Sequence, residues 1–185
     1  MKERPRTHTF ENAERVGELY LADLGLAWEE LQGKKVLDIG AGPAEFENAA
    51  RRRGIEVVSM DNMSDLHVPP RDSRYVVAEA TQLPFNEGLF DIALSHMSVT
   101  NYGPESAAEY TRFLQEVLRD ACRVLKRNGE FRFMDTRVEP SEREDEIVAD
   151  LAARAGFREV RRGEYDRLRP VQEEYRLSHF YIATK

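Results

Sequence analysis

The residues best suited to binding a ligand are the glycines of Gly40-Ala41-Gly42, which follow the short apolar run 36–39. Glycine lets the backbone turn tightly and lets a ligand approach it, because no Cβ stands in the way. Residues 44–53 can then begin a helix, whose N-terminus directs backbone N–H groups outward. A second apolar run, 55–60, ends in Asp61, a carboxylate placed to accept hydrogen bonds from the two hydroxyls of a ribose. The turn and the acid together predict a nucleoside-containing ligand.

The apolar pattern places these residues among alternating strands and helices. Helical periodicity predicts helices over 10–24, with a further turn near Trp28 and Leu31, over 44–53, along the stripe from Tyr110 to Leu125, and over 141–155. The third of these helices is expected to end at Lys126-Arg127-Asn128-Gly129, since cations and glycine suit helix C-termini. Strands are expected at 36–39, 55–60, 74–79, 90–95, 130–135, 157–162 and 174–184.

This order predicts an α/β fold in one structural domain. Serial βα units imply a parallel sheet with helices on both faces, and a final strand pair without a crossover helix is most simply antiparallel. The expected architecture is a Rossmann-like, doubly wound, mostly parallel seven-stranded sheet with an antiparallel C-terminal strand, in three α/β/α layers. Residues 33–185 form this domain. The N-terminal helical segment, 1–32, packs on it or covers the ligand cleft, with Tyr20 near the cleft.

Composition limits the function classes. The chain has 185 residues, 41% hydrophobic and 33% charged, which is typical of a soluble globular domain. A net charge of −7 disfavours a nucleic-acid binder, and no apolar run approaches the roughly 20 residues of a membrane helix. The polar N-terminus shows no signal peptide, and the single cysteine, Cys122, favours a reducing cytoplasm. The four histidines lack ligand spacing, so no metal is expected.

With its motifs in this order, the chain resembles the class I S-adenosylmethionine-dependent methyltransferases, in particular the group described as methyltransferase type 11. The resemblance rests on 36–43, on Asp61, on Leu83-Pro84-Phe85 followed by Phe90-Asp91, and on 125–130. It implies S-adenosylmethionine as the cofactor, without a metal.

The resemblance also assigns roles to residues. It places Gly40, Ala41 and Gly42 beside the amino-acid part of the cofactor, with Asp38 holding that part or ordering the turn. It places Asp61 on the ribose hydroxyls and Asn62 alongside the adenine. After the third strand, the residues expected to border the adenine are Glu79, Ala80 and Thr81. After the fourth strand, the residues expected to line the methionine moiety and the substrate mouth are Ser95, His96 and Met97.

Two positions depart from the family pattern. Glu79 stands where the family usually has Asp, so its carboxylate reaches one methylene further. Ala44 replaces a third turn glycine, which is tolerable if that residue is already helical. A nicotinamide- or flavin-binding Rossmann domain is the nearest competitor. Its fingerprint would need a small residue at 45, where Glu45 would face a pyrophosphate.

Methyl transfer is an in-line displacement that depends mainly on bringing the acceptor close and aligned. A general base is needed only when the acceptor must lose a proton, and His96 is the candidate; its alternative part is to shape the cofactor pocket. Tyr20, Asn101 and Tyr102 are expected to face the substrate. The Asn-Pro-Pro-[Tyr/Phe] motif associated with nucleic-acid base or glutamine methylation is missing after the fourth strand. A small-molecule acceptor is expected, with a protein side chain or a non-catalytic binding protein as alternatives. The oligomeric state stays open.

Overall fold

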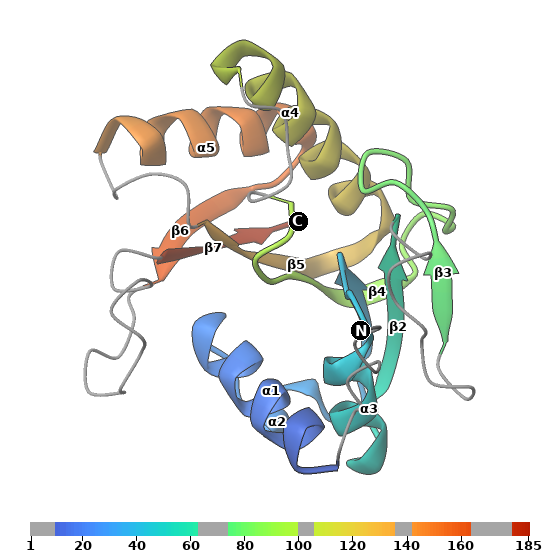
Figure 1. The fold of residues 1–185 in the computed structure, drawn as a ribbon. Helices are drawn as coiled ribbons and strands as arrows, with labels where there is room; N and C mark the ends of the chain where they lie inside the picture. The colour runs from blue at the N-terminus through green and yellow to red at the C-terminus, as the bar shows by residue number, and fades with distance from the viewer. Residues whose placement is uncertain (1–9, 63–73, 100–105, 136–141, 164–178) are drawn as a thin grey trace, which may run out of the picture.

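The computed structural model describes residues 10–62, 74–99, 106–135, 142–163 and 179–185. They form one seven-stranded sheet in the order β3-β2-β1-β4-β5-β7-β6. The strands are β1 (Lys35–Ile39), β2 (Glu56–Asp61), β3 (Tyr75–Val77), β4 (Phe90–Ser95), β5 (Leu125–Asp135), β6 (Glu159–Gly163) and β7 (His179–Thr184). The helices are α1 (Phe10–Asp23), α2 (Trp28–Leu31), α3 (Glu45–Arg52), α4 (Ala107–Val124) and α5 (Glu142–Ala155). The first three lie on one face of the sheet and the last two on the other (Figure 1), which confirms the three-layer α/β/α prediction.

Strand direction follows the predicted scheme. β3, β2, β1, β4 and β5 pair in parallel, whereas β7 runs antiparallel to both β5 and β6. The parallel strands therefore present their carboxyl ends at one edge, where ligands of open α/β sheets bind. In register, Ile39 at the end of β1 lies opposite Met60 of β2.

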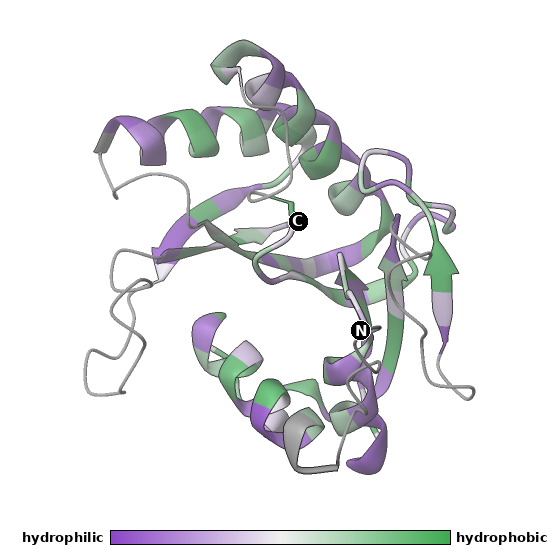
Figure 2. Ribbon diagram, viewed as in Figure 1, coloured by the Kyte–Doolittle hydropathy of each residue, from purple (hydrophilic) through white to green (hydrophobic). Residues whose placement is uncertain are grey.

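Both faces of the central strands are buried, and alternate side chains of these strands serve different layers. Phe131, Phe133 and Tyr181 pack with α4 and α5. Their strand neighbours Met134 and Ile182 pack on the opposite face with α1 and α3. Apolar and polar residues alternate along α4 and α5 (Figure 2), as expected of helices with one buried side.

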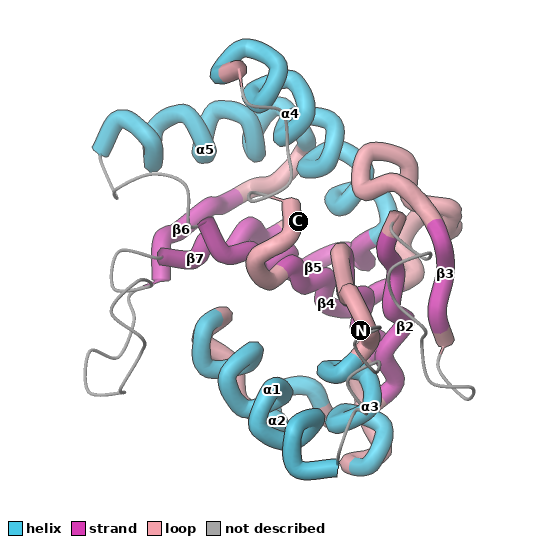
Figure 3. Tube along the Cα trace, viewed as in Figure 1, coloured by secondary structure: helices cyan, strands magenta, loops and turns pink. Residues whose placement is uncertain are grey.

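The end of α4 differs from the prediction. The helix stops at Val124 and passes directly into β5 (Figure 3), so 126–129 do not form its last turn. Leu125 instead pairs with Phe90 of β4, and Asn128 takes a left-handed conformation with φ 66°. Long-range strand pairing therefore overrides the helix-ending signal of cations and glycine. β3 is also shorter than the predicted strand 74–79, and the predicted strand residues 174–178 lie outside the described part of the chain.

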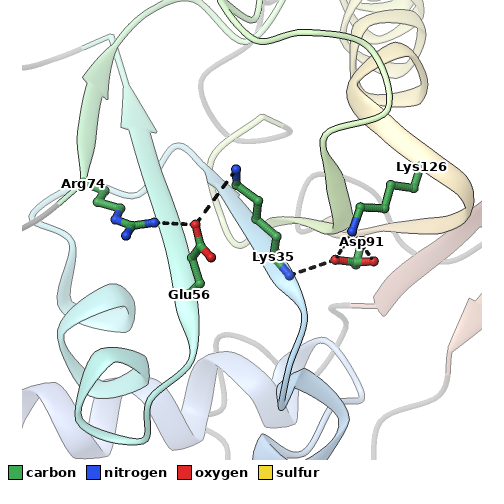
Figure 4. Close-up of polar contacts among 5 residues, drawn as sticks. All are labelled: Lys35, Glu56, Arg74, Asp91 and Lys126. Carbon is green, nitrogen blue, oxygen red and sulfur yellow. Dashed lines mark hydrogen bonds and ion pairs between the residues drawn. The ribbon is translucent and has the colours of Figure 1, made fainter.

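The amino ends of the strands carry a row of charges of alternating sign. Arg74 pairs with Glu56, Glu56 with Lys35 at 3.9 Å, and Lys126 Nζ donates to both oxygens of Asp91 at 2.8 and 2.9 Å (Figure 4). The Lys35 backbone N–H also donates to Asp91 at 2.9 Å. This row ties neighbouring strands together at the edge opposite the one where ligands bind.

Candidate functional site

A cleft of about 570 Å³ opens at the carboxyl ends of β1, β2 and β4. This size suits a small-molecule ligand. Its wall comes from the glycine turn, the ends of β2 and β3, the loop after β4, and one side chain of α4. The lining residues are Ile39, Gly40, Gly42, Pro43, Met60, Asp61, Asn62, Ala78, Glu79, Ala80, Met97, Ser98, Val99 and Phe113.

The glycine turn is fixed to β2 and to the loop after β4. The N–H groups of Gly40 and Ala41 both donate to the Met60 carbonyl, at 2.8 and 3.0 Å. Gly40 has φ 77°, and a Cβ there would lie 2.0 Å from Ser98 Oγ. That hydroxyl donates to the Ile39 carbonyl at 2.8 Å. Position 40 therefore requires glycine, because its backbone is left-handed and because the Ser98 side chain leaves no room for a Cβ.

Asp61 is held by the turn itself. The Gly42 N–H donates to Asp61 Oδ2 at 2.9 Å, and the Tyr75 hydroxyl donates to the Gly42 carbonyl at 3.1 Å. Burial, followed by the charges of Asp61 and Asp38, raises the pKa of Tyr75 to about 12, so it stays a donor. The Gly42 N–H is thus already engaged by a carboxylate. The cleft lining also carries two carboxylates, those of Asp61 and Glu79, which disfavour a pyrophosphate.

Ala44 stands where the family usually has a third turn glycine, and this replacement was expected to be tolerable if the residue were helical. In the structure Ala44 is not helical. It has φ 58° and ψ 35°, the left-handed region, and it immediately precedes α3. For a residue with a Cβ this conformation costs roughly 1–2 kcal/mol. Ala44 is also fully buried, so the turn retains its shape at the expense of local backbone strain.

The far end of the cleft carries a polar pair. Asn62 Nδ2 donates to Glu79 Oε2 at 3.1 Å, and the Ala78 N–H donates to the Asp61 carbonyl at 3.1 Å. These bonds hold the ends of β2 and β3 together. The longer side chain of Glu79 is accommodated by its contact with Asn62.

Several predicted site residues lie behind the cleft or outside its lining. Asp38 is fully buried and accepts a hydrogen bond from the Tyr20 hydroxyl. His96 Nε2 lies 2.8 Å from Asp23 Oδ2, and its ring packs on Tyr20 with centroids 4.6 Å apart. Ala41, Thr81 and Ser95 are also absent from the lining, and Asn101 and Tyr102 lie outside the described residues.

The N-terminal helices pack beneath the sheet. Tyr20, Leu21 and Leu24 join the core on the face covered by α3, and none of the described side chains of α1 and α2 lines the cleft. Ser98 and Phe113 also line the cleft, and neither is among the predicted site residues. Phe113 belongs to the apolar stripe of α4, and only its position near the carboxyl edge of the sheet distinguishes it from the other residues of that stripe. No sequence signal identified Ser98.

The charge of the cleft is one-sided. Asp61 and Glu79 contribute carboxylates, and none of the described lining residues is a lysine, arginine or histidine.

Within the described ranges, no group of three or more His, Cys, Asp or Glu side chains could hold a metal ion. Over the same ranges, no helix has the length and apolar character needed to cross a membrane.

Comparison with known proteins identifies the same region. The family model described as "Methyltransferase domain" matches residues 37–133. An uncharacterized methyltransferase of Mycobacterium sp. (strain KMS) is 41% identical over 81 residues, covering 40% of this chain and 32% of that protein. The demethylmenaquinone methyltransferase of Paenarthrobacter aurescens (strain TC1) is 32% identical over 91 residues, covering 47% and 34%. The matched region thus spans about a third of these relatives' own length.

Among solved structures, the chain is similar to a SAM-dependent methyltransferase from Archaeoglobus fulgidus. The TM-score is 0.64 at 20% sequence identity, covering 95% of this chain and 98% of that one. This likeness supports the Rossmann-like fold.

Proposed function

This chain belongs to the methyltransferase domain family, and we propose that it transfers a methyl group from S-adenosylmethionine to a small-molecule acceptor. The observation that carries the proposal is the donor set of the cleft. It offers carboxylates, an amide and glycine backbone, and its described lining has no cation. This set suits a ligand with ribose hydroxyls, an adenine amine and a positive charge, and disfavours a phosphate-bearing one.

Each part of the cofactor can be assigned residues of the cleft that would contact it. Asp61, oriented by the Gly42 N–H, would accept the ribose hydroxyls. The backbone of Gly40 and Gly42 would border the amino-acid end, as the resemblance implies. Asn62 and Glu79 would approach the adenine, together with Ala80. When bound, the cofactor supplies a methyl group already activated by a sulfonium.

The task of the protein is then to align the acceptor with that methyl group. His96 is better placed to position the site than to act as a base, since its Nε2 contacts Asp23 at 2.8 Å. It directly precedes Met97 and Ser98, which line the cleft. We therefore propose a positioning part for His96, and an acceptor that needs no early proton removal.

A small acceptor is supported by the relative named as acting on demethylmenaquinone, which is itself a small molecule. Asn101 and Tyr102 remain the proposed substrate-facing residues.

We also propose a cytoplasmic location, supported by the buried free thiol of Cys122.

Calorimetric titration with S-adenosylhomocysteine tests the cofactor assignment. Micromolar binding is expected, and Asp61→Asn should weaken it about tenfold or more through the lost charge-assisted hydrogen bonds. Asp91→Asn, which changes a carboxylate at the opposite edge of the sheet, should leave the affinity unchanged. An acceptor screen with isotopically labelled S-adenosylmethionine would follow.

Two results would count against the proposal. A folded wild type, shown by its thermal transition, that binds no S-adenosylhomocysteine would refute the cofactor assignment. Tight binding without transfer to any acceptor, including protein side chains, would favour the non-catalytic alternative.

A further inference from the structure

Tyr20 of α1 lies in an unusually constrained position behind the glycine turn. Its ring stacks on Phe46 of α3, with centroids 4.5 Å apart, and packs at a tilt against His96 after β4, with centroids 4.6 Å apart. Its hydroxyl donates to Asp38 Oδ1 at the end of β1. One helical turn later, Asp23 contacts His96. Helix α1 therefore touches the two strand ends that carry the cleft walls, while its described side chains stay outside the cleft lining.

Asp38 is the least satisfied carboxylate in this region. It is fully buried, and its second oxygen, Oδ2, accepts no hydrogen bond from any residue that the structure describes. A buried carboxylate with a single donor is costly in its charged form. It lies two residues before Gly40, so its charge reaches the cleft through protein rather than water, where charges interact more strongly.

Resting on the proposed function, we propose that Tyr20 is a positioning residue for the methyl donor. Its hydroxyl favours the charged form of the Asp38 carboxyl behind the turn, and that charge favours the cationic donor over the product. S-adenosylmethionine carries a sulfonium, whereas S-adenosylhomocysteine carries an uncharged thioether. The two ligands otherwise differ only by the transferred methyl group, so a change in their affinity ratio with pH reports the charge of Asp38 rather than the methyl group.

The titration of Asp38 makes this discrimination depend on pH. Burial raises the pKa of Asp38 to about 7; the hydrogen bond from Tyr20 lowers it, and the charges of Asp61 and Glu47 raise it. Burial also keeps the pKa of Tyr20 well above its usual value, so Tyr20 remains a donor. Loss of that donor would move the pKa of Asp38 further upward, leaving the carboxyl protonated at neutral pH.

The groups that face this pair come from every neighbouring element. Tyr20 contacts Asp38 from α1, and Asp61 and Glu47 act on it from β2 and α3. His96, after β4, packs on the Tyr20 ring. Burial raises the pKa of Glu47 as well, so a variant of Asp38 itself is needed to separate the two titrations.

The test compares the dissociation constants of the two ligands by calorimetry at about pH 6 and about pH 8, on either side of the Asp38 pKa. In the wild type, the preference for S-adenosylmethionine over S-adenosylhomocysteine should rise by about threefold to tenfold between the two pH values. Tyr20→Phe should hold the preference near its low-pH value throughout. Asp38→Asn, which keeps an oxygen that can accept from Tyr20, should give a low preference independent of pH.

Glu14→Gln is the matched control, because Glu14 lies on the same helix and pairs with Arg53 of the α3 C-terminus. It should behave as wild type. A purely structural part for Tyr20 would weaken both ligands equally in Tyr20→Phe and leave the pH dependence of their ratio intact, which would overturn the inference. A wild-type ratio that does not change with pH would overturn it as well. If the folded wild type binds neither ligand, the proposed function itself fails. If Tyr20→Phe does not fold, the pH dependence of the ligand preference in Asp38→Asn decides whether the Asp38 charge discriminates between the ligands.

Discussion

Replacing Ala44 by glycine should leave the stability of the protein nearly unchanged, although a buried methyl group is lost. Three terms set the expected value. Relief of the left-handed conformation at φ 58° returns roughly 1–2 kcal/mol. Removal of the fully buried methyl costs about 0.8 kcal/mol, and the greater freedom of glycine in the unfolded chain costs about 0.4–1 kcal/mol. The net change therefore lies within about 0.8 kcal/mol of zero.

Ala49→Gly supplies the matched control within the same segment. Ala49 is also fully buried, but it lies inside α3 with its methyl facing Gly17 of α1. The same methyl is lost there without relief of strain, and glycine inside a helix costs about 1 kcal/mol more. The expected destabilisation is about 2 kcal/mol, or a fall in Tm of about 4–8 °C.

Urea unfolding of the two variants measures the difference directly. A gap of about 2 kcal/mol between Ala44→Gly and Ala49→Gly is expected, and most of it is the strain stored at the turn. Equal destabilisation by the two substitutions would refute the left-handed conformation of Ala44 as a source of strain. The m-value should be the same in both, since neither changes the surface exposed on unfolding.

Three further outcomes are expected. Gly40→Ala should destabilise by about 3 kcal/mol, because the new Cβ meets Ser98, whereas Gly54→Ala, at a similar φ of 72° in open space, should cost about 1 kcal/mol. Arg132→Met should cost about 2–4 kcal/mol in urea unfolding, because the buried guanidinium donates to the Leu24 and Gly25 carbonyls after α1. Asp91→Asn should cost under about 1 kcal/mol at neutral pH, and this cost should disappear once the pH falls below the lowered folded-state pKa of Asp91.

The sign of the last prediction follows from the pKa of Asp91. Partial burial raises it, but the bonds from Lys126 and the Lys35 amide outweigh burial and lower it overall. The stabilisation is therefore complete above the unfolded value and disappears as the pH falls through the folded one. A difference between variant and wild type that grows toward acid pH would contradict this.

Equal costs for Gly40→Ala and Gly54→Ala would contradict the Ser98 contact. A cost for Arg132→Met as small as that for the exposed Arg158→Met would contradict the anchoring of the end of α1 by the Arg132 guanidinium.

Much of the fold could be predicted because its signals are local. The apolar runs at 36–39 and 55–60 have the length of buried strands, and the stripe through Val117 and Leu118 has helical periodicity. Serial βα units then leave few topologies. The same logic placed the antiparallel C-terminal pair correctly. It failed at 126–129, where pairing of Leu125 with Phe90 decided the conformation.

The sequence by itself determined the turn, the acid at the end of β2 and the family. Gly40 and Asp61 are recognisable because glycine conformation and strand-end position are properties of short segments.

Only the tertiary structure decided which side chains line the cleft and which lie behind it. His96 meets Asp23, 73 positions away, and Tyr20 meets Asp38, 18 positions away. These contacts exist because the order β2-β1-β4 brings strand ends together above α1 and α3. Periodicity and spacing describe neighbours along the chain, and they carry no information on partners that only sheet order and packing bring into contact.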